Sequence, residues 1–515
     1  MPKLDINPQF KKALDLMEKT DKSVFITGKA GTGKSTLLNY FCDNSEKSTV
    51  ILAPTGVAAV NIGGQTIHSF FNFKPNVTTD EAKKSAKKIL GRCGDVFDNL
   101  DMIIIDEISM VRADLMDCID VCLKTIYKNK KPFGGLQMVF FGDLYQLPPV
   151  LTGNDKEIFS KHYDSCYFFD AKIMKDFQME FIELEKIYRQ KDSGFIETLN
   201  SIRNNTTEDR HLELINSRFC GDIDTDDLED GYIYLTTTNK MADKINKLNL
   251  DKLSEEEIVL TGEISGDFDS KYLPTDVELS LKVGAQVMLL KNDSKGRWVN
   301  GTVGKIVEFD DENEVVVVKL SSGWDVCVKP ERWDIYETKF NKKTKKLEKN
   351  TLGFFVQYPI KLAWAITVHK SQGKTFDKVV IDLSGGVFAC GQTYVALSRC
   401  RSLDGIILKK PVKKSQILVD WKIAKFMTSY QYKISEQICS REDKEQIILQ
   451  AAKEKRKIRI VYLKAKDQKS EREILPKKIE EMEYLGKKFI GLKAYCYLRK
   501  EDRVFKVERI LEILE

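Results

Sequence analysis

The most informative segment of the chain is Ser23-Val-Phe-Ile-Thr-Gly28-Lys-Ala-Gly-Thr-Gly-Lys34-Ser-Thr36. A short apolar run, typical of a buried strand, enters a loop with the pattern GxxxxGK[ST], and a helix-forming run follows. In this context glycines allow backbone N–H groups and a helix N-terminus to surround a phosphate. Lys34 is expected to reach the β- and γ-phosphates of a nucleotide, and Ser35 to place its hydroxyl on Mg²⁺. The expected nucleotide-binding residues here are Gly28, Ala30, Gly31, Thr32, Gly33, Lys34, Ser35 and Thr36.

Further apolar runs follow, and each ends in polar residues: Thr49–Ala53, Met102–Ile105 and Leu136–Phe141. Continuous apolar runs favour parallel strands buried on both faces, and such sheets bind ligands at the carboxyl ends of their strands. Asp106 and Glu107 directly follow one run. Asp106 is expected to hold Mg²⁺ through water, and Glu107 to orient and deprotonate an attacking water. We predict one nucleotide-binding α/β domain over residues 1–186.

A second set of strands is predicted beyond residue 187, without a second phosphate-binding loop. Its apolar runs are Tyr232–Leu235, Leu362–Thr367 and Val379–Leu383. Between residues 286 and 356, short valine-rich runs are separated by Gly, Asn and Asp turns. This pattern indicates a small antiparallel β insertion that is either barrel-like or an edge extension of the second sheet. We therefore predict a second α/β domain over residues 187–285 and 357–425, interrupted at 286–356.

Length and composition narrow the class of protein. With 515 residues, the chain is long enough for about three domains. Its 42% hydrophobic and 31% charged residues exclude a collagen-like, disulfide-scaffold or wholly disordered protein. No membrane span or signal peptide is recognisable, so a cytosolic or nuclear location is expected. The 11 cysteines form no CxxC pair and the 4 histidines are dispersed, so we predict no structural metal.

Charge is unevenly distributed along the chain. Residues 440–515 hold 21 Lys and Arg against 15 Asp and Glu, whereas the whole chain has a net charge of +5. A near-neutral body therefore carries a basic C-terminal segment. Such a segment is either a surface for a polyanion or a solvated helical face on which Lys and Glu alternate.

Several longer motifs complete the pattern. Pro54–Ala59 and Gln65–Phe70 follow the phosphate loop, and Pro132–Gln137 precedes Gly142-Asp-Leu-Tyr-Gln146-Leu-Pro-Pro149. Leu184–Gln190 and Ala396–Cys400 each carry an arginine, and Thr367–Gly373 follows a predicted strand. Together these motifs resemble the petite-integration-frequency (Pif) DNA helicases, the 5′-to-3′, RecD-like branch of helicase superfamily one. The resemblance covers about Leu4 to Val412 and implies two RecA-like domains, an SH3-like barrel inserted in the second, and ATP with Mg²⁺ as cofactors.

The resemblance also implies roles for individual residues. Gln9 is similar to an adenine-reading glutamine, and Gln146 would sense the γ-phosphate. Arg189 and Arg399 would neutralise the transferring phosphoryl group from across a closing cleft. Gln372 and Gly373 would link nucleotide to DNA. The implied catalytic set is Lys34, Asp106, Glu107, Gln146, Arg189 and Arg399.

Single-stranded DNA is the partner that the resemblance implies, held across both domains by groups that contact phosphates without reading bases. The expected DNA-binding residues are Pro54, Thr55, Thr66, His68, Phe70, Thr237, Asn239, Thr367, His369 and Lys370. Phe70 and Phe73 are equally compatible with core packing. The charged, helical segment at about residues 72–95 stands where the family carries a strand-separating wedge.

The C-terminal segment resembles a WYL domain, a small β-rich module, over residues 451–515, after a linker and helix at 426–450. It departs from the name-giving motif, since Ile490-Gly491-Leu492 stands at that place. Lys493, Tyr495, Arg499, Arg503 and Arg509 would form a basic patch for single-stranded nucleic acid. A dimerisation or regulatory module without DNA contact is the alternative.

We therefore predict an ATP- and Mg²⁺-dependent 5′-to-3′ DNA helicase that unwinds duplex, G-quadruplex or RNA–DNA hybrid in genome maintenance. It would act as a bacterial, cytoplasmic, nucleoid-associated monomer on single strands and on single-strand/duplex junctions. Two alternatives share the same motifs: a single-strand translocase that displaces proteins with little unwinding, and a DNA-gated ATPase switch. A transcription regulator is suggested by the C-terminal segment alone.

Overall fold

The computed structural model describes residues 6–151, 159, 161–221, 231–268, 273–464, 467–484 and 486–514. The chain divides into two compact units. The larger comprises Met1–Ile202 and Thr207–Leu418, and the smaller comprises Arg203–Thr206 and Val419–Glu515. Among the helices of the described residues, none combines the length and the apolar character needed to span a lipid bilayer.

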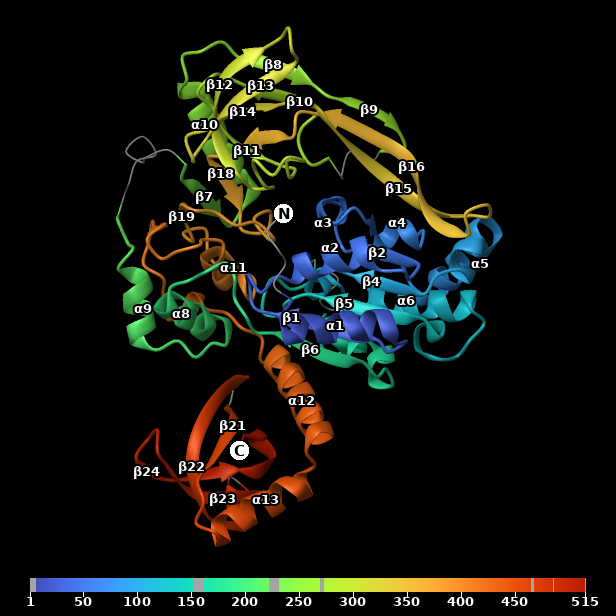
Figure 1. Cartoon of the computed structure of the whole chain (residues 1–515). Helices are drawn as coiled ribbons and strands as arrows, with labels where there is room; N and C mark the ends of the chain where they lie inside the picture. The colour runs from blue at the N-terminus through green and yellow to red at the C-terminus, as the bar shows by residue number, and fades with distance from the viewer. Residues whose placement is uncertain are drawn as a thin grey trace. The chain divides into compact units, whose positions relative to one another are not determined.

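A six-stranded, entirely parallel sheet organises the first part of the larger unit, in the order β3-β2-β4-β5-β1-β6 (Figure 1). Every residue of β1, β4 and β5 is buried, as their continuous apolar runs predict. The strands are β1 (Val24–Gly28), β2 (Thr49–Ala53), β3 (Gln65–Thr66), β4 (Met102–Ile105), β5 (Gln137–Phe141) and β6 (Glu180–Leu184). The helices are α1 (Pro8–Lys19), α2 (Lys34–Asn44), α3 (Gly56–Asn61), α4 (Ile67–Phe70), α5 (Thr79–Asp98) and α6 (Ala113–Ile126).

Helix α5 occupies the charged segment that was expected to be helical. It begins with a capping box: the Thr78 hydroxyl accepts the Glu81 N–H, and the Glu81 carboxylate accepts the Thr78 N–H. These two bonds satisfy N–H groups that a helix start otherwise leaves without partners. Ala82, Ala86 and Ile89 are buried one helical turn apart, while the lysines between them face solvent.

A second, four-stranded parallel sheet follows in the order β18-β7-β19-β20. Its strands have only three or four residues each. β18 and β19 are shorter than the apolar runs from which they were predicted, and β20 was not predicted. They are β7 (Ile233–Thr236), β18 (Ala365–Thr367), β19 (Val379–Ile381) and β20 (Ile406–Leu408). The accompanying helices are α8 (Ser193–Arg203), α9 (Asp209–Asn216), α10 (Asn239–Lys252) and α11 (Gln392–Ser398). The two parallel sheets confirm the predicted α/β class.

The valine-rich segment between β7 and β18 forms a five-stranded antiparallel sheet in the order β14-β13-β12-β11-β17. Alternate side chains, such as Val316, Val318 and Leu320, enter a shared core. The strands are β11 (Gln286–Leu289), β12 (Val303–Asp310), β13 (Val315–Leu320), β14 (Asp325–Val328) and β17 (Ile360–Leu362). The strand β17 lies beyond the predicted end of this insertion at residue 356.

A long hairpin extends from this region toward the first sheet (Figure 1). It consists of β15 (Glu331–Asn341) and β16 (Lys346–Gln357), with β9 (Glu263–Gly266) beside β16. Lys342 at its tip pairs with Asp95 of α5 at 3.0 Å, and Gln65 of β3 donates to the Thr338 hydroxyl at 2.9 Å. The charged sequence of the tip indicated no strand. A further strand pair, β8 (Ile258–Thr261) and β10 (Glu278–Leu281), completes the larger unit.

The smaller unit is a five-stranded antiparallel sheet, β24-β23-β22-β21-β25, with two helices. Its elements are α12 (Trp421–Ile438), α13 (Arg441–Lys453), β21 (Ile458–Lys464), β22 (Gln468–Tyr484), β23 (Lys487–Cys496), β24 (Glu501–Lys506) and β25 (Ile510–Leu514). Ile448 of α13 packs in one core with Ile460, Leu492 and Phe505. The Ser435 hydroxyl of α12 donates to the Leu511 carbonyl at 2.6 Å. Helix α12, much of which lies in the linker expected at 426–450, therefore belongs to this unit.

Candidate active site

The residues predicted to carry chemistry stand at the carboxyl ends of the parallel strands. The phosphate loop follows β1, Asp106 and Glu107 follow β4, and Gly142 with Asp143 follows β5. Lys34 folds back over the loop, where its Nζ donates to the carbonyls of Gly28 at 2.6 Å and Lys29 at 3.0 Å. Because parallel strands end at the same edge of their sheet, these three segments converge.

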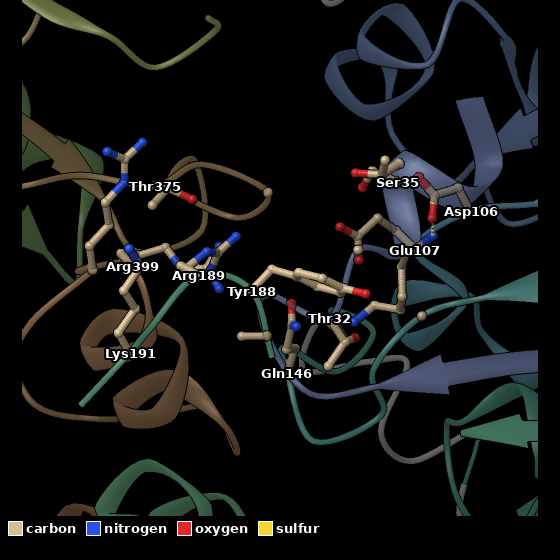
Figure 2. Close-up of a pocket in the computed structure, with 18 of the residues that line it drawn as sticks. Thr32, Ser35, Asp106, Glu107, Gln146, Tyr188, Arg189, Lys191, Thr375 and Arg399 are labelled. Atoms are coloured by element: carbon tan, nitrogen blue, oxygen red, sulfur yellow. Dashed lines mark hydrogen bonds between the residues drawn. The ribbon is translucent and has the colours of Figure 1, made fainter. Parts of the chain in front are cut away.

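A cavity of about 1110 Å³ opens at this edge, and both parallel sheets contribute to its walls (Figure 2). Five basic and three acidic side chains line it, so the cavity favours an anionic ligand. The predicted site residues in its wall are Ala30, Gly31, Thr32, Gly33, Lys34, Ser35, Thr36, Asp106, Glu107, Gln146, Arg189, Gly373 and Arg399. Figure 2 shows Ser35, Asp106 and Glu107 on one side, with Arg189 and Arg399 on the other.

Glu107 is held in an unusual environment. Its backbone is in the left-handed region, with φ of 50°, and its N–H donates to Asp106 Oδ1 at 2.8 Å. Burial, with a smaller effect of neighbouring Asp106, raises the pKa of Glu107 to about 7. Burial likewise raises the pKa of Asp106. A half-buried carboxylate with a pKa near neutrality is suited to accept a proton from water.

The guanidinium groups of Arg399 and Arg189 donate hydrogen bonds to neutral backbone carbonyls. Arg399 is 1% exposed, and its guanidinium donates to the carbonyls of Val395 at 3.0 Å and Lys374 at 3.2 Å. Arg189 Nη1 donates to the Ser398 carbonyl at 3.0 Å. Burial, and then the nearby Arg399, lowers the pKa of Arg189 to about 9. Burial also lowers the pKa of Arg399. An anion that enters the cavity would stabilise both cations, of which Arg399 is buried and Arg189 is half-buried.

Direct contacts join the two walls of the cleft. The Ala30 N–H of the phosphate loop donates to the Tyr394 hydroxyl of α11 at 2.9 Å. Gly31 has a φ of +80°, and a Cβ at this position would collide with Arg189 Cβ. The loop therefore needs glycine here both for its backbone conformation and for the close approach of the segment that carries the arginine.

Three predicted nucleotide-site residues lie outside the cavity wall. Gln9 forms a reciprocal pair with Glu185: its Nε2 donates to the carboxylate at 3.1 Å, and its Oε1 accepts the Glu185 N–H at 3.1 Å. Gly28 contributes the carbonyl that holds Lys34. Gln372 reaches the site through Glu107, to whose Oε2 its Nε2 donates at 2.9 Å.

Several wall residues were not predicted. The sequence analysis did not assign Phe10, Tyr188, Lys191, Asp192, Thr375, Arg401 and Ser402, all of which line the cavity. Tyr188 and Lys191 stand within two residues of Arg189, and Arg401 stands two residues after Arg399, so proximity to the arginine motifs was an available signal. Phe10 carried no such signal, because its position below Gly33 depends on how α1 packs.

The predicted DNA-binding residues lie at the same edges of the two sheets. The hydroxyls of Thr55, Thr66 and Thr367 accept backbone N–H groups of Ala58, Ser69 and Lys370, so they already cap local turns. Asn239 begins α10, and Pro54 follows β2.

Aromatic and buried residues complete this set. The ring of His369 stacks on exposed Phe388, with centroids 6.0 Å apart. Phe70 is half-buried against Phe71 and Phe97, and Phe73 is buried against Phe71. Thr237 is buried, and its hydroxyl has no hydrogen-bond partner in the part of the chain that the structure describes. Burial lowers the pKa of His68. Lys370 is exposed beside His369.

The basic residues of the smaller unit are differently placed. Lys493 pairs with Glu480 at 2.6 Å, Arg503 lies 3.6 Å from Glu501, and Arg509 hydrogen-bonds with Tyr432. Arg499 is exposed. Two residues close in sequence to Arg499, Tyr495 and Tyr497, form an edge-to-face aromatic pair. Lys457 Nζ stands 4.0 Å from the centre of the Tyr497 ring. An aromatic pair beside a cation is typical of surfaces that bind single strands.

Comparisons with known proteins agree with this geometry. Residues 6–213 match the model of PIF1-like helicases, 268–309 the 2B domain of DNA helicase Pif1, and 444–514 the WYL domain. The ATP-dependent DNA helicase Pif1 of Bdellovibrio bacteriovorus is 32% identical over 439 residues, which cover 83% of this chain and 93% of that protein. The chain belongs to the PIF1-like helicase family.

Solved structures of the family resemble the chain as well. Bacteroides sp Pif1 in complex with ADP-AlF4 has a TM-score of 0.75 and 36% identity, covering 84% of this chain and 98% of that one. Bacteroides Pif1 bound to ssDNA has a TM-score of 0.59 and 35% identity, with coverage of 84% and 98%. The chain spans 57–58% of the length of five vertebrate Pif1 relatives. As a PIF1-like helicase with a C-terminal WYL domain, it is an ATP-dependent DNA helicase and an ATP hydrolase.

Proposed function

We propose that this PIF1-like helicase moves 5′ to 3′ along single-stranded DNA and unwinds the duplex that it meets. The observation that carries the proposal is the cleft, in which the phosphate loop and Glu107 face Arg189 and Arg399 across one cavity. An ATP bound between the two sheets draws them together, and loss of the γ-phosphate releases them. A motor that grips DNA on both sheets converts this closure into steps.

In this mechanism Glu107 takes the proton of the attacking water, and Lys34, Arg189 and Arg399 stabilise the negative charge on the transferring phosphoryl group. Gln146 is proposed to sense the γ-phosphate. Gln9, the phosphate loop, Gln372 and Gly373 are proposed to bind or report the nucleotide. The rings of Phe10 and Tyr188, which line the cavity, support an adenine site next to Gln9. Gln9 would exchange its bonds to Glu185 for bonds to the base.

Mg²⁺ fits the same wall. The Ser35 hydroxyl and the Asp106 carboxylate both line the cavity, and oxygen ligands of this kind are those that Mg²⁺ prefers. Among the described residues no cluster of three or more His, Cys, Asp or Glu side chains could hold a metal. Ser35 and Asp106 would therefore hold Mg²⁺ together with the nucleotide, where the ion neutralises phosphate charge.

The DNA path is proposed to run along the carboxyl edges of both sheets. Pro54, Thr55, Thr66, His68 and Phe70 would contact it from the first sheet. The second sheet would contribute Thr237, Asn239, Thr367, His369 and Lys370. The stacking of His369 on exposed Phe388 supports this path, because such a surface accepts bases of any sequence. Single strands and single-strand/duplex junctions are the proposed partners, with a monomer as the working form.

We propose the predicted division, with 1–186 and its wedge at about 72–95, a second α/β domain, the insertion and the WYL domain, but with two boundaries moved. The insertion extends to β17 at Leu362, and the smaller unit begins before α12, at Val419. The WYL domain is proposed to add affinity for single strands. Because its substrate would be chromosomal DNA, including G-quadruplexes and RNA–DNA hybrids, we propose a cytoplasmic, nucleoid-associated location in a bacterium.

The test is ATP-driven unwinding of one duplex that carries either a 5′ or a 3′ single-stranded tail. Opening of only the 5′-tailed substrate is the expected result. Opening of only the 3′-tailed substrate would reverse the proposed polarity. If neither opens while DNA still stimulates ATP hydrolysis, the chain is a translocase or a DNA-gated switch, and displacement of a bound protein separates these two.

A further inference from the structure

Lys374 lies beside the cavity proposed to bind ATP, but its side chain bonds to a residue outside that cavity. Its neighbours Gly373 and Thr375 line the cavity, whereas the Lys374 Nζ donates to Asn300 Oδ1 at 2.6 Å. Asn300 precedes β12 in the five-stranded sheet of the insertion. Lys374 is only 9% exposed. A motif of the nucleotide site is therefore tied to the insertion through a buried ammonium group.

The same asparagine makes a second contact, to the first parallel sheet. Asn300 Nδ2 donates to Asn61 Oδ1 at 3.2 Å, and Asn61 is the last residue of α3. Helix α3 begins after Thr55, which is one of the proposed DNA-binding residues. Asn300 thus accepts from the second sheet's loop and donates to the first sheet's helix. One amide links three segments that are far apart in sequence.

The backbone of Lys374 connects this chain of bonds to catalysis. Its carbonyl accepts the Arg399 Nη1–H at 3.2 Å, beside the Ser371 carbonyl, which accepts it at 3.4 Å. Any displacement of Lys374 by Asn300 therefore moves a carbonyl that holds Arg399. Because Arg399 must reach a phosphoryl group, a small displacement changes the rate strongly.

The burial of Lys374 makes its hydrogen bond to Asn300 important for the position of its side chain. Burial, and then the charge of Lys361, lowers the pKa of Lys374 to about 7. Within the described ranges no carboxylate pairs with Lys374, and Asn300 Oδ1 is its hydrogen-bond partner. A buried lysine that loses its acceptor leaves N–H groups unsatisfied, whether it is the ammonium or the amine. The position of the Lys374 side chain therefore depends on the position of Asn300.

We propose that Lys374, Asn300 and Asn61 form a bridge that couples DNA binding at α3 to the position of Arg399. The three are positioning residues and touch neither nucleotide nor DNA. DNA that seats against Thr55 orients α3, and the bridge passes that orientation to the carbonyl of Lys374. The bridge rests on the proposed DNA path, and it goes beyond it by naming the residues that carry the coupling.

The experiment measures coupling directly. Anisotropy of a labelled oligothymidine gives its affinity for the full chain with and without ADP, aluminium fluoride and Mg²⁺. The variants are Asn61→Ala, Asn300→Ala and Lys374→Met. Asn313→Ala is the matched control, because Asn313 lies in an exposed turn of the same sheet, and its partner among the described residues is Asp310. We expect the ratio of the two affinities to fall about fivefold or more in the three variants, with affinity in the absence of nucleotide unchanged.

Two further comparisons separate a bridge from ordinary loss of structure. Asn61→Ala removes a bond between exposed side chains and leaves the core intact, so it tests the bridge even if Lys374→Met folds poorly. The double variant Asn61→Ala/Asn300→Ala should lose no more coupling than Asn300→Ala alone, since both changes break one chain of bonds.

An unchanged affinity ratio in Asn61→Ala and Asn300→Ala would overturn the bridge, as would additive losses in the double variant. Equal weakening of DNA binding in both nucleotide states by Lys374→Met would make Lys374 a DNA ligand instead. A wild-type chain that shows no nucleotide effect on DNA affinity would also overturn the bridge. A wild-type chain that couples the two ligands but unwinds nothing would overturn the proposed function and leave the bridge standing.

Discussion

Gln372 Nε2 donates a hydrogen bond to Glu107 Oε2 at 2.9 Å, and the two residues are separated by 265 positions in the sequence. Glu107 follows a strand of the first parallel sheet, and Gln372 follows a strand of the second. The carboxylate proposed to activate water is therefore oriented by a residue that follows a strand of the other sheet. If the proposed closure of the cleft occurs, it acts on the orientation of the base through this bond.

The first prediction concerns this bond. We expect Gln372→Ala to lower kcat for DNA-stimulated ATP hydrolysis about tenfold, because a hydrogen bond to a charged group contributes about 1.5 kcal/mol or more. KM for ATP should change little, since Gln372 lies outside the cavity wall. Steady-state ATPase at saturating single-stranded DNA measures both constants.

Gln372→Glu is the informative companion of this variant. It keeps the length of the side chain but places a third carboxylate beside Asp106 and Glu107, so hydrolysis should fall further than in Gln372→Ala. Equal activity of wild type and both variants would mean that the bond does not form in the working state.

The second prediction is a pH dependence. The pKa of Glu107, raised to about 7 mainly by burial, leaves this side chain largely protonated at pH 6. A protonated carboxyl cannot accept the proton of water, so single-turnover hydrolysis should rise between pH 6 and pH 8 and level off above. A flat profile over this range would argue against Glu107 as the base.

The same shift has a consequence for stability. A carboxyl group with a folded-state pKa above its unfolded value stabilises the folded chain below about pH 4.5 and loses that contribution as pH rises to about 7. Glu107→Gln removes the buried charge. We therefore expect thermal unfolding of the nucleotide-free variant to occur above that of wild type at pH 8, with the difference shrinking toward pH 5. Hydrolysis should be lost at every pH.

The sequence predicts the local parts of this site well. The apolar run Ser23–Thr27, the phosphate loop and the pair Asp106–Glu107 are each defined by neighbours within a few residues, and the structure places them as expected. The contacts of Tyr394 with Ala30 and of Gln372 with Glu107 could not be derived from the residues alone. They join segments hundreds of residues apart, and only the packing of the two sheets brings these together.

The long hairpin shows a second limit. Its tip, with Lys342, Lys343, Lys345 and Lys346, carries no apolar alternation, so nothing local predicts strands there. The pairing of β15 with β16 over eleven positions supplies the backbone bonds that hold it, and Lys342 then meets Asp95. Register and long-range ion pairs stabilise such a segment, and neither is visible as periodicity.

The third prediction concerns Arg399. Its guanidinium donates through Nε, Nη1 and Nη2 to the groups that fix it, including the carbonyls of Val395 and Lys374. Lysine carries the same charge but cannot make this fork of bonds. We expect Arg399→Lys to lower kcat by about 10³, with ATP binding largely kept, because an arginine finger acts on the transition state. Titration with a fluorescent nucleotide measures binding, and a steady-state ATPase assay measures kcat. A parallel loss of binding would mean that Arg399 contacts the nucleotide already in the ground state.

The last prediction concerns the smaller unit, where the basic residues differ in their neighbours. Lys493 pairs with Glu480 at 2.6 Å, and Arg503 lies 3.6 Å from Glu501. Lys457 likewise lies 3.6 Å from Glu473, but its Nζ also stands over the ring of Tyr497, and Arg499 is exposed nearby. We expect Lys457→Ala/Arg499→Ala to weaken single-strand binding by the full chain. Loss of two phosphate contacts should reduce the slope of log affinity against log salt by about 1.4.

Lys493→Ala/Arg503→Ala is the matched control, since it removes the same charge from residues that lie near carboxylates but, among the described contacts, over no aromatic ring. Its salt slope should change much less. Truncation after Leu418 removes residues 419–515 of this unit and should match or exceed the effect of Lys457→Ala/Arg499→Ala. Truncation after Cys439 should instead lower solubility, because it strips α12 of the partners of Ser435. DNA-independent ATPase should persist in both substituted chains, because the cleft lies in the larger unit. If the two double variants share one salt slope equal to that of wild type, the WYL domain does not bind the strand through this surface.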